Sequence, residues 1–155
     1  MIEKSSLKYL RKMVHSDLDN VMKGEIDSYP YPWSLGNFED CLRHHRLYSC
    51  WVFELENVST GHVVISAGAG EAHILNICVY PPEQNKGWGR KLLAEAEWIA
   101  KQYKAENCIL EVRPSNKAGI HLYQTEGYNE IGIRPDYYPA DKGREDAIVM
   151  AKALS

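Results

Sequence analysis

The stretch from Ile74 to Val112 most constrains the fold, because the spacing of its apolar residues changes twice. "ILNICV" at 74–79 is a mostly apolar run typical of a strand, and a loop with two glycines follows it. "NCILEV" at 107–112 is again short and apolar, as a strand buried on both faces would be. Between these runs, apolar residues recur at helical spacing at Leu92, Leu93, Ala96, Ile99, Ala100 and Tyr103. The order strand, helix, strand predicts a parallel crossover at the centre of a mixed α/β sheet.

Further helices and strands flank this crossover on both sides. We predict a helix from Ser16, capped by Ser16 or Asp17 and ended by "YPYPWS", and a second helix after Ser34. Three β-rich runs, "SCWVFEL", "GHVVISAG" and "AHILNICVY", are separated by turn-forming "NVSTG" and "GAGE" and predict an antiparallel meander. A helix that begins at Ser115 and ends at Gly127 precedes two closing strands, "YNEIGI" and "EDAIVMAK". One domain over residues 1–155 is expected.

Composition and charge argue against several classes of protein. The chain has 155 residues, a net charge of -3 and a pI near 6.1, whereas a direct nucleic-acid binder carries an excess of basic residues. Its four cysteines form no CxxC pair, which predicts reduced thiols and no metal site. No stretch approaches the ~20 apolar residues of a membrane span, and the charged start predicts no signal peptide. We therefore expect a cytoplasmic protein that binds neither metal nor membrane.

The loop between Gln84 and Arg90 has two glycines, Gly87 and Gly89, at the predicted start of a helix. A helix start carries unpaired amide N–H groups and the positive end of the helix dipole, and glycine lets an anion approach these amides closely. The pattern therefore indicates a phosphate-bearing ligand, with a plain strand-to-helix turn as the alternative. It matches neither a Walker loop nor a dinucleotide-binding fingerprint, because the last glycine of the fingerprint is Leu92 here.

The pattern Q-x-x-G-x-G at the start of a helix, after a bulged strand, resembles the acetyl-CoA pyrophosphate loop of the GNAT superfamily of N-acetyltransferases. Further segments resemble its bacterial members that acetylate the N-terminal alanine of a ribosomal protein: "PWS" at 32–34, "NICV" at 76–79, "LEVRPSN" at 110–116, "LYQTEGY" at 122–128 and "YYPADKGREDAIVMA" at 137–151. The resemblance implies a mixed central sheet with splayed parallel strands flanked by helices. It also implies acetyl-CoA as co-substrate and the N-terminal peptide of small-subunit ribosomal protein eighteen as partner.

By this resemblance, the coenzyme binds along one strand, the glycine loop and an asparagine further on. The residues concerned are Ile77, Cys78, Val79, Gln84, Asn85, Lys86, Gly87, Trp88, Gly89, Arg90 and Asn116. A backbone amide near Val79 would stabilise the oxyanion, and Trp88 would either cover the coenzyme or shield the helix start. Cys78 could be a nucleophile, but the family transfers acetyl directly, which favours a buried apolar cysteine.

Glu111 is a carboxylate inside the otherwise apolar "CILEV", where burial of a lone charge is costly. It either leaves the core, pairs with Arg113, or acts as a general base whose pKa is raised by apolar surroundings. Tyr123 lies seven residues after Asn116, so both share one helix face, and packing in the core is the alternative role for this tyrosine. The resemblance assigns the base to Glu111 and the proton donor to Tyr123. His73 is isolated in the sequence and is expected to pack or to face solvent.

Three hypotheses about the function stay open. The first is transfer of the acetyl group to the N-terminal α-amine of a ribosomal protein. An α-amine with a pKa near ~8 is roughly a tenth neutral at pH 7, and a lysine amine about one part in 2,500, so a modest base suits the α-amine. The second hypothesis is transfer to lysine or a small amine. The third is a non-catalytic acyl-CoA-binding module, which would need neither Glu111 nor Tyr123. A peptide groove could be lined by Asp136, Tyr137, Tyr138, Asp141, Glu145 and Asp146, with a polar surface loop as the alternative.

Overall fold

The computed structural model describes residues 7–155. The prediction that the chain has no signal peptide rests partly on the first six residues, which lie outside the described range. Seven strands form one sheet in the order β1-β2-β3-β4-β5-β7-β6. The strands are β1 (Leu10–Lys12), β2 (Tyr48–Leu55), β3 (Val58–Gly68), β4 (Glu71–Val79), β5 (Asn107–Val112), β6 (Asn129–Pro139) and β7 (Arg144–Ala153). The predicted order of helices and strands is confirmed, except that the short edge strand β1 precedes the first helix.

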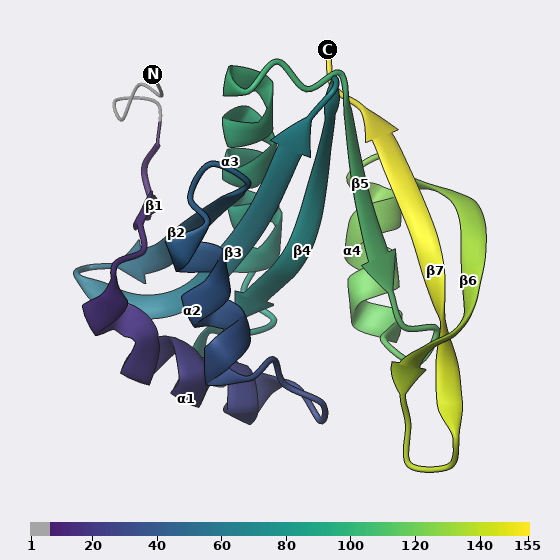
Figure 1. Cartoon of the computed structure of the whole chain (residues 1–155), viewed down its shortest axis with the longest axis horizontal. Helices are drawn as coiled ribbons and strands as arrows, with labels where there is room; N and C mark the ends of the chain where they lie inside the picture. Colours follow the sequence, from purple (N-terminus) through teal and green to yellow (C-terminus); the bar gives the residue numbers. More distant parts are fainter. Residues whose placement is uncertain (1–6) are drawn as a thin grey trace.

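Helices cover both faces of the sheet (Figure 1). α1 (Leu18–Ser28) and α2 (Leu35–Arg43) pack on one face, and α3 (Trp88–Gln102) and α4 (Lys117–Thr125) pack on the other. Each face buries its own apolar cluster. The cluster under α1 and α2 contains Leu18, Val21, Phe38, Val52 and Val64, and the larger one under α3 and α4 contains Trp51, Phe53, Ile65, Leu92, Ile99 and Leu110. No helix within residues 7–155 is long and apolar enough to cross a membrane.

The first residues of the helices are capped in different ways. Ser34 caps α2 as predicted, because its Oγ accepts a hydrogen bond from the N–H three residues later, at 3.1 Å. At α1 the expected side-chain cap is missing, since the Asp17 carboxylate instead accepts a bond from the preceding Val14 N–H at 2.8 Å. α4 is capped one residue later than predicted, by Asn116, whose Oδ1 accepts from the Gly119 N–H at 3.0 Å.

The meander of β2, β3 and β4 is antiparallel, as predicted. Its two turns are tighter than the turn-forming sequences suggested: Glu56 and Asn57 form the first, and Ala69 and Gly70 form the second. All four residues have positive φ, which is the conformation that tight two-residue hairpin turns use. The remainder of "NVSTG" therefore belongs to β3.

β4, α3 and β5 form the predicted crossover, and β4 pairs with β5 in parallel. The expectation that β5 is buried on both faces is wrong, because only Cys108, Leu110 and Val112 are buried. α3 and α4 cover the face on which these residues lie. Ile109 and Glu111 on the other face are only partly covered, since α1 and α2 pack over β2, β3 and β4 rather than over β5.

β4 and β5 pair along their first halves and then diverge (Figure 1). Their pairing ends at Ile74 of β4 and Leu110 of β5. A β-bulge at Leu75 follows at once, where the register of β4 with β3 shifts by one residue. The bulge exchanges the faces of the strand, so that Ile74 packs under α3 and Asn76 bonds to α1. The splay of parallel strands implied by the resemblance is therefore confirmed.

The two closing strands are longer than predicted and do not lie in chain order. β7 pairs antiparallel with both β5 and β6, so it lies between them. The hairpin of β6 and β7 extends beyond the end of β5 (Figure 1). This extension forms one wall of the cavity between the splayed strands.

Candidate active site

A cavity of about 670 Å³ opens where β4 and β5 diverge. Its walls come from β4, β5, α4, the segment between α1 and α2, and the β6–β7 hairpin. It brings together four of the residues predicted for catalysis or coenzyme binding, Ile77, Glu111, Asn116 and Tyr123. The glycine loop at 84–90 does not line this cavity but lies after the end of β4, at the start of α3.

Glu111 lies near the end of β5, with 7% of its side chain exposed. Its Oε1 contacts Nε2 of His73 on β4, and its Oε2 lies 3.4 Å from Nε of Arg134 on β6. The hydrogen bond from His73 lowers the pKa of Glu111 and outweighs burial, which acts in the opposite direction. The prediction that the pKa of Glu111 is raised is therefore wrong. Its ion-pair partners are His73 and Arg134 rather than Arg113, and His73, which is isolated in the sequence, contacts a site residue in the structure.

Tyr123 and Asn116 both line the cavity, as their shared helix face predicted. The phenol of Tyr123 is buried, and burial raises its pKa to about 12. It therefore keeps its proton at neutral pH and can act as a hydrogen-bond donor. Asn116 uses Oδ1 to cap α4, and Gly119 leaves room for this cap, because a Cβ there would lie 2.6 Å from Asn116 Nδ2.

The backbone of the loop at 84–90 adopts an unusual conformation at the start of α3. Asn85 and Gly87 have positive φ of 61° and 85°, and Gly87 is the N-cap of α3. Within residues 7–155, no N–H group of 85–90 donates a loop or turn hydrogen bond, so these donors remain free at the helix start. The two positions favour glycine for different reasons. Gly87 adopts a left-handed backbone conformation, whereas a Cβ on Gly89 would lie 3.2 Å from the side chain of Leu122 on α4.

Two side chains of this loop, Gln84 and Trp88, contact neighbouring elements of the fold. Gln84 donates from Nε2 to the carbonyl of Val79 at 2.8 Å, which holds the loop against the end of β4. The ring of Trp88 packs edge-on against Tyr9 and Phe53, with centroid distances of 5.4 Å and 6.0 Å. Trp88 therefore packs against these two aromatic residues, and its role toward the coenzyme stays a prediction.

The two cations of the loop, Lys86 and Arg90, are exposed and each faces one carboxylate. Lys86 Nζ lies 3.4 Å from Glu83, and Arg90 Nε lies 3.2 Å from Glu126. Exposed ion pairs contribute little to stability, so both cations can turn toward an anionic ligand at small cost.

The edge of β4 beyond the bulge presents main-chain groups to the splay. The N–H of Tyr80 donates to Thr60 of β3 at 2.8 Å, so the N–H of Val79 points to the opposite, open side. On that side the carbonyl of Ile77 accepts a hydrogen bond from the hydroxyl of Tyr29, at the end of α1. The β4 edge therefore offers the Val79 N–H to a ligand, while the Ile77 carbonyl is already bonded.

Cys78 does not line the cavity and is buried under α1. Its Sγ lies 4.0 Å from the carbonyl of Gly24, and burial raises the pKa of the thiol to about 12. Such a thiol carries almost no thiolate at neutral pH, and the thiolate is the nucleophile. The environment of Cys78 supports the buried apolar role.

The segment between α1 and α2 meets the β6–β7 hairpin across the end of β5. The guanidinium of Arg113 lies 4.8 Å from the ring centre of Tyr31 and 4.3 Å from that of Tyr138. Its Nη1 lies 3.2 Å from the carboxylate of Glu145, and the hydroxyl of Tyr31 donates to Asp141. These contacts join the two walls of the cavity.

The acidic residues predicted for a peptide groove lie outside the lining of the cavity. The two tyrosines Tyr137 and Tyr138 line the cavity, but none of the four acidic residues predicted with them does: Asp136, Asp141, Glu145 and Asp146. Asp146 accepts a hydrogen bond from the Asp136 N–H of the hairpin, Glu145 from the Ser115 N–H after β5, and Asp141 from the Tyr31 hydroxyl. Sequence reasoning missed the lining by Tyr29, Tyr31 and Arg113. The signal for the two tyrosines was the aromatic run "YPYPW", whose prolines were interpreted as a helix break.

Glu25 is a second buried carboxylate of the cavity wall, with 1% exposure, and sequence reasoning missed it. It accepts hydrogen bonds from His62 Nε2 at 3.0 Å, from Asn76 Nδ2 at 3.1 Å and from the Trp33 N–H at 2.9 Å. The other ring nitrogen of His62 lies 2.8 Å from the hydroxyl of Tyr80, so this cluster has no free imidazole nitrogen for a metal ion. The network joins α1 and the segment before α2 to β3 and β4.

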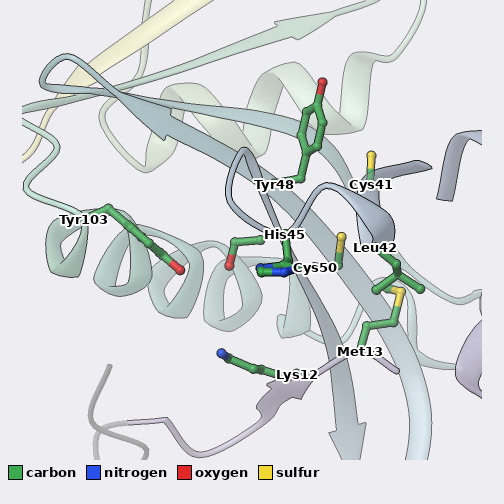
Figure 2. A pocket seen from close by; sticks show the side chains of 9 residues that line it. Lys12, Met13, Cys41, Leu42, His45, Tyr48, Cys50 and Tyr103 are labelled. Carbon is green, nitrogen blue, oxygen red and sulfur yellow. The ribbon is translucent and has the colours of Figure 1, made fainter. Parts of the chain in front are cut away.

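A smaller cavity of about 130 Å³ lies between α2 and β2. Figure 2 shows the side chains around it, which include Cys41, Cys50 and His45. None of the residues predicted for the site lines this cavity. All four cysteines of the chain are free thiols, in agreement with the expectation of reduced cysteines.

Known proteins resemble this chain in sequence and in structure. Residues 18–128 match the acetyltransferase (GNAT) family. The ribosomal protein bS18-alanine N-acetyltransferase of Escherichia coli strain K12 is 34% identical over 140 residues, which cover 90% of this chain and 93% of that protein. The protein of the same name from Haemophilus influenzae is 33% identical over 136 residues, which cover 87% and 91%.

A solved structure agrees with these relatives. The crystal structure of the Escherichia coli ribosomal-protein-S18-alanine N-acetyltransferase superposes with a TM-score of 0.85 at 32% identity, over 94% of this chain and 93% of that one. The fold and the family implied by the glycine loop and the downstream segments are confirmed. This chain belongs to the acetyltransferase (GNAT) family.

Proposed function

We propose that this protein transfers the acetyl group of acetyl-CoA directly to the α-amine of the N-terminal alanine of ribosomal protein bS18, in the cytoplasm. The observation that carries the proposal is that Glu111 and Tyr123 line one cavity, beside a strand edge with a free main-chain donor. The relatives at 33–34% identity act, by their names, on the same amine.

The residues around the glycine loop fit the diphosphate of acetyl-CoA. The free N–H groups of 85–90 and the positive end of the α3 dipole would hold it, and Lys86 and Arg90 would add charge. The backbone of 77–79 would pair with the pantetheine arm, and the amide of Asn116 would donate to it. Gln84 and Trp88 would contribute by shaping the loop. When bound, acetyl-CoA supplies the acetyl group as a reactive thioester.

Glu111 accepts the proton that the substrate ammonium must lose before the amine can attack. Because the pKa of Glu111 is lowered, it is a weak base. A weak base suits an amine that is roughly a tenth neutral at pH 7, and it suits a lysine amine, at about one part in 2,500, poorly. This favours an α-amine acceptor over a lysine side chain.

Two hydrogen-bond donors serve the later part of the reaction. The N–H of Val79 stabilises the oxyanion that forms as the amine attacks. The hydroxyl of Tyr123 acts as general acid toward the departing sulfur. With a pKa of about 12 it is a weaker acid than a thiol of pKa ~8.5, so its hydrogen bond to the thiolate contributes more than complete proton transfer.

The test compares acceptors in a free-thiol assay with acetyl-CoA. One peptide begins with alanine, followed by basic and aromatic residues, and a matched peptide is blocked at its α-amine but contains lysine. We expect turnover of the first peptide only, with the mass increase of one acetyl group at its N-terminus. Equal turnover of the blocked peptide would favour a lysine acetyltransferase. Coenzyme binding without turnover of any amine would favour a non-catalytic module.

A substitution at Gly87 tests the prediction that the glycine loop binds acetyl-CoA. A Gly87→Val change inserts a Cβ where the anion approaches and strains a residue with φ of 85°. We expect the dissociation constant for acetyl-CoA, measured by calorimetry, to rise at least about tenfold, as loss of one or two charge-assisted hydrogen bonds implies. Gly70→Val is the matched control, because Gly70 also has positive φ and open space around it, but lies in the β3–β4 turn. Equal affinities of Gly87→Val and wild type would contradict the assignment.

A substitution at Cys78 tests the proposal that the acetyl group passes directly from the coenzyme to the amine. Because its thiol is buried and protonated, the Cys78→Ala variant should keep a kcat within about threefold of wild type, although truncation of a buried side chain lowers stability. Intact-mass spectrometry of wild type with acetyl-CoA and no acceptor should detect no acetylated protein. A covalent acetyl group on Cys78, together with an inactive but folded variant, would rule out direct transfer.

A further inference from the structure

Several titratable groups surround the carboxylate of Glu111. β7 places a valine opposite Glu111, and β3 places a serine opposite His73, so neither strand adds a charge through these paired positions. The titratable or charged groups that face the carboxylate are His73 from β4, and Arg134, Tyr137 and Tyr138 from β6. The basicity of Glu111 therefore depends on these side chains.

Among these residue types, only histidine ordinarily changes its charge near neutral pH. An arginine guanidinium is not deprotonated in proteins. The phenols of Tyr137 and Tyr138 stay neutral, because burial raises their pKa values above the ordinary value for tyrosine. An imidazole, in contrast, ordinarily gains its charge between about pH 5 and 8.

The geometry joins His73 to Glu111 and keeps it away from the substrate. Nε2 of His73 contacts Oε1 of Glu111, and Oε2 lies 3.4 Å from Nε of Arg134, so the substrate amine would replace Arg134 at Oε2 rather than His73 at Oε1. The contact crosses the last paired part of β4 and β5, immediately before the strands splay. His73 does not line the cavity, and 31% of its side chain is exposed, so solvent protons reach it without entering the site.

We propose that His73 is a positioning residue that orients Glu111 and sets its strength as a base according to pH, an inference that rests on the proposed function. A neutral imidazole donates its Nε2–H to Oε1 and holds the carboxylate in one orientation. An imidazolium makes the same bond and adds a positive charge, which weakens the carboxylate as a base and repels the substrate ammonium. The enzyme is therefore less active when His73 is charged.

The test uses two substitutions at His73 and compares each variant with wild type at the same pH, so that titration of the substrate cancels. His73→Gln keeps an N–H donor but cannot become charged. We expect its kcat to equal that of wild type above about pH 8 and to exceed it at least about threefold toward pH 5, because imidazoles ordinarily gain their charge over this range. His73→Leu has no donor, and its kcat should be at least about tenfold lower at every pH, because Glu111 is no longer oriented. His45→Gln, in the other cavity, is the control and should follow wild type throughout.

Two outcomes would overturn the inference in different ways. A constant ratio of the His73→Gln and wild-type rates across the pH range, or full activity of His73→Leu, would remove the role of His73 and leave the proposed function intact. Failure of wild type to acetylate the alanine peptide would overturn the proposed function and the role of His73 with it. Melting temperatures of both variants verify that they are folded.

Discussion

Substitution of Glu111 by Gln is expected to lower kcat by about 10²–10⁴-fold, the range that general acid–base catalysis contributes. Glutamine keeps the size of the side chain and can still bond to His73, but its amide cannot take a proton from the amine. Affinity for acetyl-CoA should be unchanged, because the glycine loop follows β4 and Glu111 lies on β5. The measurement is free-thiol release with the alanine peptide, together with calorimetry of coenzyme binding.

A matched substitution separates this effect from a general loss of negative charge. Glu130 is an exposed glutamate on β6, and Glu130→Gln should retain the kcat of wild type. If Glu111→Gln kept more than about a tenth of the wild-type kcat while binding coenzyme normally, the base would have to be another group.

The largest expected effect on stability comes from Glu25→Ala, with a loss of about 3–5 kcal/mol in the free energy of unfolding. The carboxylate is 1% exposed and accepts bonds from His62, Asn76 and the Trp33 N–H. Alanine would leave these buried donors without an acceptor, and each such donor costs about 1–3 kcal/mol. Urea denaturation measures the difference, and for a domain of this size the melting temperature should fall by roughly 6–20 °C.

Glu39 supplies the comparison for Glu25. It lies in the neighbouring helix α2, where its partly exposed carboxylate is 3.6 Å from His15, so Glu39→Ala should change the free energy of unfolding by less than about 0.5 kcal/mol. Equal stabilities of Glu25→Ala and Glu39→Ala would mean that the buried network does not hold α1 to the sheet.

Much of this architecture could be predicted because its signals are local. The change of apolar spacing around the glycine loop predicts strand, helix and strand, and a parallel crossover is the usual arrangement of that order. Ser34 and Gly127 are likewise recognised at helix ends from a few neighbouring residues. The short strand β1 was missed because only three residues pair, too few for an alternating pattern.

The site residues also divide into those with a local signal in the sequence and those without one. Glu111 is conspicuous in the sequence because a carboxylate interrupts an apolar run. Helical spacing places Tyr123 on the same face as Asn116, but its role as proton donor is implied only by the resemblance. The direction of the Glu111 pKa was predicted wrongly, since it depends on His73, which is 38 residues away in the chain. The acidic residues predicted for a peptide groove do not line the cavity, and two of them, Asp141 and Glu145, bind groups from other segments of the chain.

By itself, the sequence determined which segments become helices and strands, where bare amides collect at a helix start, and which carboxylate is out of keeping with its surroundings. Only the tertiary structure decided that Glu111 faces a histidine, that tyrosines and Arg113 line the cavity, and that Glu25 anchors its wall. The physical reason is one of range. Backbone conformation and hydrophobic periodicity act over a few neighbouring residues, whereas charge strength and cavity lining depend on groups that different strands bring within a few ångströms.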